Sequence, residues 1–470
     1  MRKEDILLVL ACTFAFLLVY SPHFMYNYPF HIDEWHHIEL ALKLNEGKKI
    51  ELMEIGFDFI LSMLSRTVNL IKVYAFLPAL FALFSAFILF YYLRKRFNSI
   101  AAFIGILLFA SLPSNVNLLG LWFFTPLTMA IPFIYLSLFI FEEALNEKNK
   151  KKFIISLILT AIAFTIHPPS GLIIILGGGF LALREKKLFK EKKDLAYLLV
   201  LLIPITAYFI ILWKGSFIST IAFLSRYLIF TKEFSVYLFS MNPIILYGII
   251  PFILALVGMV KSFKIKKLQE FSFIFILSVI NFIIFSIFDV TFFAHYQRVI
   301  YYAMLSAVPL SAIGFIYVYA SIKKLIKNNA FKTILLITLI IIAILPPYIN
   351  YYKLHQQARL YTLVNPEEVP ALEFVRTLPE PIIITPRRIG NVLYPFTQKE
   401  ALISLYWHKH KKEKEIEVFY KEDCDYEEDL LREIPADYVF SFDKINCSFL
   451  MPIFEDESFV YSVNLSNQNT

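Results

Sequence analysis

The chain has 470 residues, of which 58% are hydrophobic and 18% are charged, and its mean hydropathy is +0.63. Soluble domains are about 45–50% apolar and about 25% charged, so this composition excludes a soluble enzyme, a disordered protein and an ordinary nucleic-acid-binding module. The net charge of +7 is a bias that usually reports helix orientation in membrane proteins. We therefore expect a polytopic α-helical membrane protein that lies in the lipid bilayer and binds no nucleic acid.

Eleven segments are candidates for transmembrane helices, because a spanning helix needs about 20 mostly apolar residues. Segment 5–21 resembles a signal peptide but has no small-residue cleavage site, so we expect it to be retained as a helix. Segment 170–183 is short, and a re-entrant segment is the alternative there. The candidates are 5–21, 72–93, 99–118, 122–142, 153–168, 170–183, 195–213, 243–260, 271–289, 299–320 and 331–349.

The distribution of basic residues predicts the orientation of these helices. The loops on the side of the N-terminus hold 23 Lys and Arg residues, the opposite loops hold 9, and 13 lie beyond residue 350. Because cytoplasmic loops carry an excess of Lys and Arg, we expect a cytoplasmic N-terminus in the cell membrane and an extracytoplasmic C-terminal region.

Two regions differ from lipid-facing helix. Within the predicted transmembrane domain, residues 1–349, the external loop 22–71 contains PFHIDEWHHIELALKLNEGKK, which predicts a helix that Asp33 or an adjacent residue caps and that Gly47 ends. The run GFDFILSMLSRTVNL follows and predicts a second helix, which lies in the membrane interface.

The second region, residues 350–470, predicts a small external α/β domain. The runs PEEVPALEFVRTLPE and YEEDLLREI favour helices, whereas PIIITP, DYVFSF and FVYSVNL favour strands. About 120 residues are enough for a separate core. Cys424 and Cys447 lie here, on the oxidising side, and either form a disulfide or stay unpaired.

The densest group of ionisable side chains lies in the external loop and comprises His31, Asp33, Glu34, His36, His37 and Glu39. On a helix, Asp33, His36 and His37 fall at i, i+3 and i+4 and share one face. A carboxylate held among aromatic residues at a membrane interface can act as a general base. The same cluster can instead bind a divalent metal ion, and a third interpretation is an ordinary solvated helix face.

The sequence Asp33-Glu34-x-His36, with Ala41 eight residues after the aspartate, resembles the first-loop acidic motif of the GT-C superfamily. These are multispanning glycosyltransferases that use lipid-phosphate sugars. The protein O-mannosyltransferase branch is the most similar, because its motif is also an Asp-Glu pair with a histidine two residues later. The expected layout of helices, external loop and external C-terminal domain adds to the resemblance. So does EVPALEFVRTLPEPIIITPRRIGNVLYPFTQKEALIS, which resembles the start of the soluble domain in many members, where a helix precedes a strand and then a loop.

The resemblance implies an inverting reaction in which Asp33 is the catalytic carboxylate. It takes a proton from the acceptor hydroxyl as that oxygen attacks the anomeric carbon, and Glu34 orients the acceptor or shares the role. The donor is a polyprenyl- or dolichyl-phosphate sugar, and the acceptor is a glycan, a lipid or a protein. The departing polyprenyl phosphate needs cationic hydrogen-bond donors.

Arg298 is the leading candidate for such a donor. It lies beside His295 and Tyr296 at the mouth of the tenth predicted span, where its planar guanidinium suits a phosphate. The alternative is an arginine that only extends to the membrane surface. Arg226, in the external loop 214–242, is a further candidate whose alternative is an ordinary solvated charge.

Two other residues are expected at the outer membrane boundary. His167 precedes Pro168 and Pro169, which break the fifth predicted span, so its imidazole either reaches the same outer cavity or is a structural histidine. Asp58 is an acid at a membrane boundary and a candidate second acid near the site. We place Asp58 with His36 and His37 in the neighbourhood of the acceptor or a metal.

The leading hypothesis is therefore a GT-C-like membrane glycosyltransferase that acts on the outer face of the cytoplasmic membrane. The rival is a transporter or flippase for a lipid-linked or anionic solute. Transporters place polar residues near the middle of broken spans, often in repeated halves, and this sequence has few such residues and no corresponding halves. A third interpretation, a membrane scaffold with an external interaction domain, leaves the Asp33 cluster unexplained.

Overall fold

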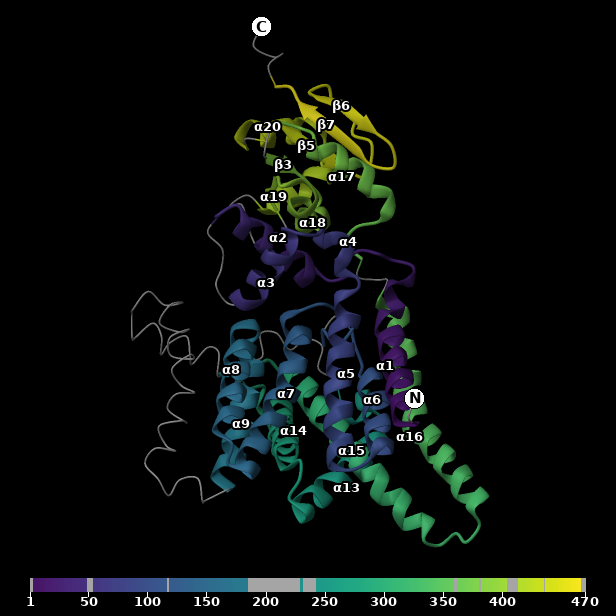
Figure 1. Ribbon diagram of the computed structural model, residues 1–470. Helices are drawn as coiled ribbons and strands as arrows, with labels where there is room; N and C mark the ends of the chain where they lie inside the picture. Colours follow the sequence, from purple (N-terminus) through teal and green to yellow (C-terminus); the bar gives the residue numbers. More distant parts are fainter. Residues whose placement is uncertain are drawn as a thin grey trace. The chain divides into compact units, whose positions relative to one another are not determined.

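The computed structural model describes residues 3–48, 54–115, 118–184, 229–230, 242–358, 362–379, 382–403, 413–434 and 436–465. Contacts within the chain divide it into two compact units, which are treated separately below (Figure 1). The helical unit comprises Met1–Asn27, Glu51–Phe57 and Tyr74–Ala358. The sheet unit comprises Tyr28–Ile50, Asp58–Val73 and Arg359–Thr470.

The helical unit is a bundle of apolar helices that run side by side (Figure 1). Ten of the eleven predicted segments form helix, and the remaining one, 195–213, lies outside the described residues. The helices are α1 (Lys3–Tyr20), α5 (Leu77–Arg96), α6 (Ser99–Ala110), α7 (Pro126–Glu147), α8 (Lys150–Ile166), α9 (Pro168–Arg184), α12 (Pro243–Tyr247), α13 (Ile249–Ile265), α14 (Gln269–Phe288), α15 (Tyr296–Lys323) and α16 (Asn329–Ala358).

Six helices in the described ranges are long and apolar enough to cross a membrane: α1, α5, α7, α14, α15 and α16. Several others are shorter than a full span, such as α6 with 12 residues and α9 with 17. The predicted class of polytopic α-helical membrane protein is confirmed. The number of eleven spans stays a prediction.

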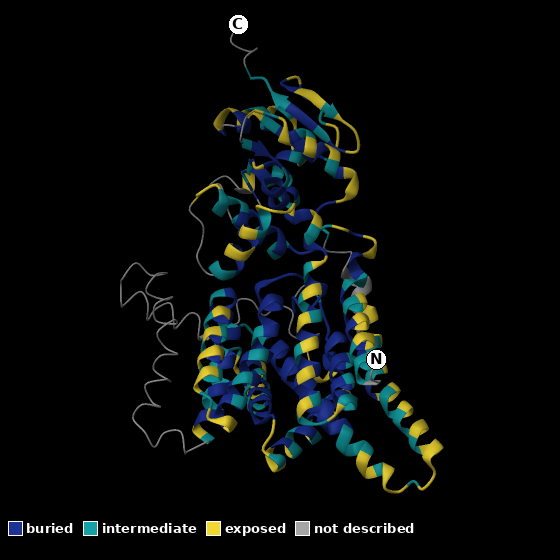
Figure 2. Cartoon of the chain, in the orientation of Figure 1, coloured by how far each residue is buried: buried dark blue, intermediate teal, exposed yellow. Residues whose placement is uncertain are grey.

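Helix α15 forms the centre of this bundle. In its most apolar stretch 94% of the residues are buried, against 11% in α16. In Figure 2, most of α15 is accordingly dark blue, whereas α16 is mostly teal and yellow. Helices α13 and α15 cross where Gly258 faces Gly314: a Cβ atom on Gly314 would overlap the backbone carbonyl of Leu254. Small residues at such a crossing let two helix backbones approach closely.

The break that the two prolines predict after the fifth segment is confirmed. Helix α8 ends at Ile166, His167 is in the extended conformation, and α9 begins at Pro168. A proline at the first position of a helix removes an N–H group that has no intrahelical partner in any case. The short segment 170–183 is part of α9, which is one continuous helix.

The sheet unit contains a five-stranded mixed sheet in the order β4-β3-β5-β7-β6. Strand β3 (Ile382–Ile384) is parallel to β4 (Glu400–Ala401) and to β5 (Tyr438–Ser441). Strand β7 (Phe459–Val463) is antiparallel to β5 and to β6 (Leu450–Glu455). The helices of this region are α17 (Val369–Arg376), α18 (Arg387–Thr397), α19 (Glu413–Val418) and α20 (Cys424–Glu433). The predicted small C-terminal α/β domain is confirmed.

Three details of this region differ from the sequence prediction or settle an open alternative. Residues 387–397, expected to be a loop, form α18, in which Ile389, Val392 and Leu393 are buried at helical spacing. Strands β4 and β6 were not predicted; β6 contains Pro452 and lies at the sheet edge, where proline is tolerated. Cys424 and Cys447 form a disulfide.

The helices predicted in the external loop are present as α2 (Ile32–Asn45) and α3 (Ile55–Ser65), followed by α4 (Leu70–Tyr74). The cap of α2 is His31, two residues before Asp33, so the prediction of Asp33 or an adjacent residue as the cap was wrong by one position. The helix ends just before Gly47, whose φ of +71° favours glycine. Helix α2 groups with residues 359–470 in the sheet unit. The predicted boundary at residue 349 and the placement of α3 in the membrane interface stay predictions.

Two short strands complete the described backbone. Strand β1 (Ile229–Phe230) pairs antiparallel with β2 (Thr291–Phe292), with Ile229 opposite Phe292. This pairing ties a residue pair from the middle of the chain to the turn that precedes α15.

Candidate active site

The first turn of α2 presents Asp33. The backbone N–H of Asp33 donates to Nδ1 of His31 at 3.1 Å, and Oε2 of Glu34 accepts from the N–H groups of Phe30 and His31 at 2.8 and 2.9 Å. This is a reciprocal cap that satisfies N–H groups with no intrahelical partner. Glu34 is fully buried, whereas the side chain of Asp33 is 23% exposed. The two acids of the predicted pair therefore have different surroundings. Glu34 is bonded to the start of the helix, and Asp33 is the solvent-accessible carboxylate.

Oδ2 of Asp33 lies 3.7 Å from Nδ1 of His31. A carboxylate that solvent reaches can serve as a general base.

One turn further along α2, His37 pairs with Asp58 of α3. Nδ1 of His37 donates to Oδ1 of Asp58 at 2.7 Å, and the two side chains are 7% and 1% exposed. The His36 ring is half-buried, with its centroid 5.7 Å from that of His37. The structure thus brings together His36, His37 and Asp58, which the sequence prediction placed in one neighbourhood.

In the helical unit, His167 lies in a hydrogen-bonded cluster. Its Nδ1 lies 2.7 Å from Oγ of Ser170 and 3.3 Å from the hydroxyl of Tyr302, and its Nε2 lies 3.8 Å from Oε1 of Glu54. The hydroxyls of Ser170 and Tyr302 are 3.0 Å apart. His167 is buried and has polar partners on both ring nitrogens, which is the arrangement expected of a structural histidine.

Arg298 lies one turn before Tyr302 on α15, at the same end of the bundle as the His167 cluster. Its guanidinium is partly buried and donates to the backbone carbonyl of Leu118 at 2.7 Å. A guanidinium has five N–H groups, so this bond leaves donor capacity for a further anion.

The neighbours of Arg298 have different surroundings. Burial, and secondly the charge of Arg298, lower the pKa of His295 to about 4, so this imidazole is neutral at neutral pH. Tyr296 is buried, and its ring stacks on Phe285 with centroids 4.5 Å apart. Of these three predicted phosphate-binding residues, Arg298 is therefore the cation, and Tyr296 contributes to packing.

Some residues of these clusters were not predicted. The sequence gives one indication of Tyr302: it falls four residues after Arg298 and therefore lies on the same face of the helix. Ser170 and Glu54 have no motif around them, and only the fold brings them to His167. Arg226 lies outside the described residues.

Within the described ranges, no group of three or more His, Cys, Asp and Glu side chains is placed to hold a metal ion.

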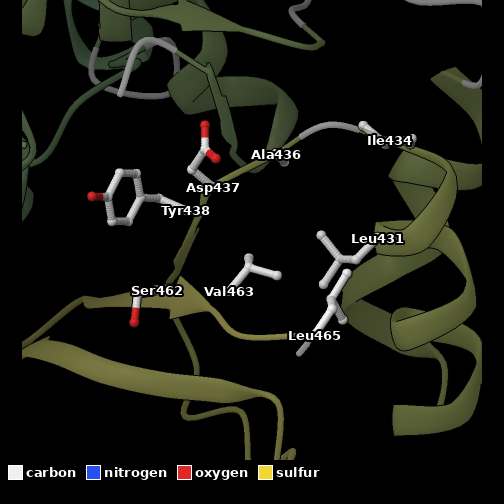
Figure 3. Close-up of a pocket in the computed structure, with 8 residues that line it drawn as sticks. All are labelled: Leu431, Ile434, Ala436, Asp437, Tyr438, Ser462, Val463 and Leu465. Atoms are coloured by element: carbon white, nitrogen blue, oxygen red, sulfur yellow. The ribbon is translucent and has the colours of Figure 1, made fainter. Parts of the chain in front are cut away.

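A pocket of about 360 Å³ lies at one end of the sheet, between α20 and strands β5 and β7 (Figure 3). Its lining includes the aliphatic side chains of Leu431, Val463 and Leu465, together with the polar residues Asp437 and Ser462. None of the predicted site residues lines it. The pocket is thus separate from the Asp33 turn within the sheet unit.

Comparison with known sequences gives a partial match. Residues 59–213 match the family described as dolichyl-phosphate-mannose-protein mannosyltransferase. The match covers less than half of the chain and begins after the Asp33 motif. A search of curated proteins found no match.

Solved structures resemble almost the whole chain. ArnT from Cupriavidus metallidurans in the apo state matches with a TM-score of 0.60 and 11% identity, covering 99% of both chains. ArnT bound to undecaprenyl phosphate matches with a TM-score of 0.58, 10% identity and 97% coverage of both chains. The archaeal oligosaccharyltransferase AglB from Archaeoglobus fulgidus, in complex with an inhibitory peptide and a dolichol-phosphate, matches with a TM-score of 0.57 and 13% identity over 94% of this chain and 69% of that one. These likenesses show a shared GT-C fold.

Proposed function

We propose that this protein is a membrane glycosyltransferase that transfers a sugar from a polyprenyl- or dolichyl-phosphate donor to a glycan, lipid or protein acceptor. The observation that carries the proposal is the likeness to ArnT along the full length of both chains. ArnT and AglB are both known in complexes with a polyprenyl-type phosphate. The partial match to the dolichyl-phosphate-mannose-protein mannosyltransferase family adds sequence-level support.

In the proposed reaction, the Asp33 carboxylate removes the proton from the acceptor hydroxyl. The hydroxyl oxygen forms a bond to the anomeric carbon of the sugar as the bond from that carbon to the phosphate oxygen breaks. The configuration at the carbon inverts, and the bonding electron pair leaves with the polyprenyl phosphate. The Arg298 guanidinium stabilises the charge that develops on this phosphate. Hydrogen bonding of Glu34 to the helix start keeps Asp33 in place.

We further propose that this reaction takes place on the outer face of the cytoplasmic membrane. The excess of 23 over 9 basic residues on the side of the N-terminus supports that orientation. The Cys424–Cys447 disulfide supports an oxidising compartment for the sheet unit. A Glu457→Cys variant tests it, because Glu457 is exposed. We expect a membrane-impermeant maleimide to label it in intact cells, and labelling only after permeabilisation would reverse the orientation.

The function is tested by release of polyprenyl phosphate from the purified protein. A panel of lipid-phosphate sugars is offered together with a membrane or glycan extract as acceptor, with and without divalent metal ions. We expect turnover by the wild type and a loss of at least about 100-fold in Asp33→Asn, the size typical of a lost general base. Glu457→Gln, an exposed acid of the same unit, is the matched control and keeps full turnover.

Each other outcome has a definite meaning. If Asp33→Asn has a normal melting temperature and still turns over the donor, the protein is a transferase but Asp33 is not its general base. Absence of turnover with every donor rejects the transferase and favours the transporter or flippase, for which lipid movement in proteoliposomes is the direct assay.

A further inference from the structure

Helix α2, which carries Asp33, packs against α18 within the sheet unit, and Tyr394 makes the polar contacts described here. Tyr394 of α18 is fully buried, and its hydroxyl accepts from Nζ of Lys48 at 2.9 Å and donates to Oε2 of Glu46 at 2.7 Å. The ammonium groups of Lys43 and Lys48 lie 4.6 and 4.9 Å from the centroid of its ring. We call Tyr394 with Lys43, Glu46 and Lys48 the tyrosine clamp.

The clamp combines two kinds of attraction. Burial raises the pKa of Tyr394 to about 12, so the hydroxyl keeps its proton at neutral pH and can donate it to Glu46. Each ammonium interacts favourably with the negative face of the ring. The hydroxyl and the ring thus hold the same end of α2 from two directions.

An ion pair extends the clamp to the sheet. Nζ of Lys43 lies 2.8 Å from Oε1 of Glu39 and 3.0 Å from Oε1 of Glu400 in β4. Burial acts to lower the pKa of Lys43, but the two carboxylates outweigh it and raise the pKa. The lysine therefore stays charged and joins α2 to the first strand of the sheet order.

A second contact holds the other end of α2. Trp35, two residues after Asp33, is fully buried, stacks on Phe396 of α18 with centroids 5.6 Å apart, and donates from Nε1 to the carbonyl of Pro29 at 3.0 Å. Tyr394 and Phe396 are two residues apart on α18, yet they contact opposite ends of α2. One short helix therefore fixes both the position and the rotation of the helix that bears Asp33.

We propose that α18 is the positioning element of the active site and that Tyr394 is a positioning residue for Asp33. This inference rests on the proposed function. A general base acts only within hydrogen-bonding distance of the proton that it removes, and small displacements are costly to rate. In this proposal the C-terminal domain holds the catalytic helix in register, so its contribution to turnover does not require direct contact with substrate.

The test uses Tyr394→Phe in the full-length protein, which removes the hydroxyl and keeps the ring. The matched control is Tyr420→Phe, which removes a tyrosine hydroxyl of the same unit that donates to the carbonyl of Phe440 in β5 at 2.9 Å. We expect kcat of Tyr394→Phe to fall about tenfold, with KM for the lipid-phosphate sugar unchanged. Tyr420→Phe keeps the wild-type kcat. Equal effects of the two variants, or an unchanged kcat in Tyr394→Phe, overturn the proposal.

A charge exchange tests the extension to the sheet. Lys43→Glu is expected to lower kcat, and adding Glu400→Lys is expected to restore at least part of it, because the pair is rebuilt with reversed signs. A double variant no better than Lys43→Glu argues against a positioning role for this pair.

Hydrogen exchange separates this inference from the proposed function. Faster exchange of the α2 amides in Tyr394→Phe, with normal exchange in Tyr420→Phe, shows that the clamp holds the helix whether or not turnover is detected. A wild type without turnover rejects the transferase, while unchanged α2 exchange rejects the clamp. The two failures therefore have different signatures.

Discussion

Nδ1 of His37 lies 2.7 Å from Oδ1 of Asp58, and both side chains are almost fully buried. The two residues come from different helices, and their bond ties α2 to α3. A second tie lies two turns further along α2, where Oγ of Ser62 donates to Oδ1 of Asn45 at 2.7 Å. These two bonds hold α2, the helix that carries Asp33, against α3. They therefore act on the position of Asp33.

The His37–Asp58 bond is expected to contribute measurable stability. In Asp58→Asn the imidazole loses its charged partner, and we expect the free energy of unfolding to fall by about 1–3 kcal/mol. Chemical denaturation of Asp58→Asn, His37→Asn and the double variant measures the coupling between the two side chains. We expect a coupling energy of at least about 1 kcal/mol; strictly additive effects contradict the bond.

A buried group of polar side chains in the helical unit makes a different prediction. The hydroxyl of Tyr92 lies 2.7 Å from Oε1 of Glu270 and 3.1 Å from Oε2 of Glu142, and Arg96 pairs with Oε2 of Glu142 at 2.8 Å. A hydroxyl has one proton and donates to one carboxylate only. The second carboxyl group must then carry a proton and donate to the tyrosine oxygen. Glu142 has the arginine, so we assign this proton to Glu270.

Amide substitutions distinguish the two glutamates. Glu270→Gln keeps a neutral group of the same shape, and we expect a change in the free energy of unfolding within about 1 kcal/mol. Glu142→Gln leaves Arg96 without its buried partner and is expected to cost about 3 kcal/mol or more. Thermal unfolding of both variants in detergent is the measurement. A Glu270→Gln variant as unstable as Glu142→Gln is incompatible with a neutral Glu270.

The sequence predicted the features that depend on local pattern. Apolar runs identified the helices of the bundle, and the spacing around Asp33 predicted α2 with its end at Gly47. The contacts that give residues their roles depend on distant segments instead. Arg96 counts in the sequence as one of the cytoplasmic charges that set orientation, but in the structure it pairs with Glu142, 46 residues later. His37 pairs with Asp58 only because α2 and α3 pack together.

Helix α18 was not predicted, although its apolar residues have helical spacing. Its sequence contains Gly390 and Pro395, which disfavour helix when considered alone. Its apolar residues nevertheless follow helical spacing, and burial against α2 and the sheet outweighs the weak propensity. The same packing brings Tyr394 into contact with Lys48, and no sequence motif predicts this contact.

The crossing of α13 and α15 is expected to tolerate no side chain. In Gly314→Ala the new methyl group overlaps the carbonyl of Leu254, so the helices must separate, at a cost of about 1–3 kcal/mol or more. Gly179→Ala on α9 is the matched control, because no atom lies within 4 Å of the added Cβ. We expect the melting temperature to fall in Gly314→Ala and to hold or rise in Gly179→Ala. Equal melting temperatures in the two variants contradict the close crossing.

The sheet unit is expected to lose stability as pH rises through neutrality. Glu427 of α20 is buried beside the disulfide, with Oε2 3.3 Å from Sγ of Cys447. Burial, and secondly the charge of Asp423, raise its pKa to about 7, whereas an unfolded chain gives about 4.3. The folded state therefore holds this proton more tightly, so the stabilisation is complete below about pH 4.3 and is lost as pH rises through about 7.

Glu427→Gln removes this dependence, because an amide does not titrate. We expect the variant to melt at a higher temperature than the wild type at pH 8 and at a similar temperature at pH 4.5. Thermal unfolding between these pH values, with the exposed Glu422→Gln as control, is the measurement. The control is expected to follow the wild-type curve. If Glu427→Gln follows that curve as well, the carboxyl group is ionised in the folded state without cost, and another group determines the response of this unit to pH.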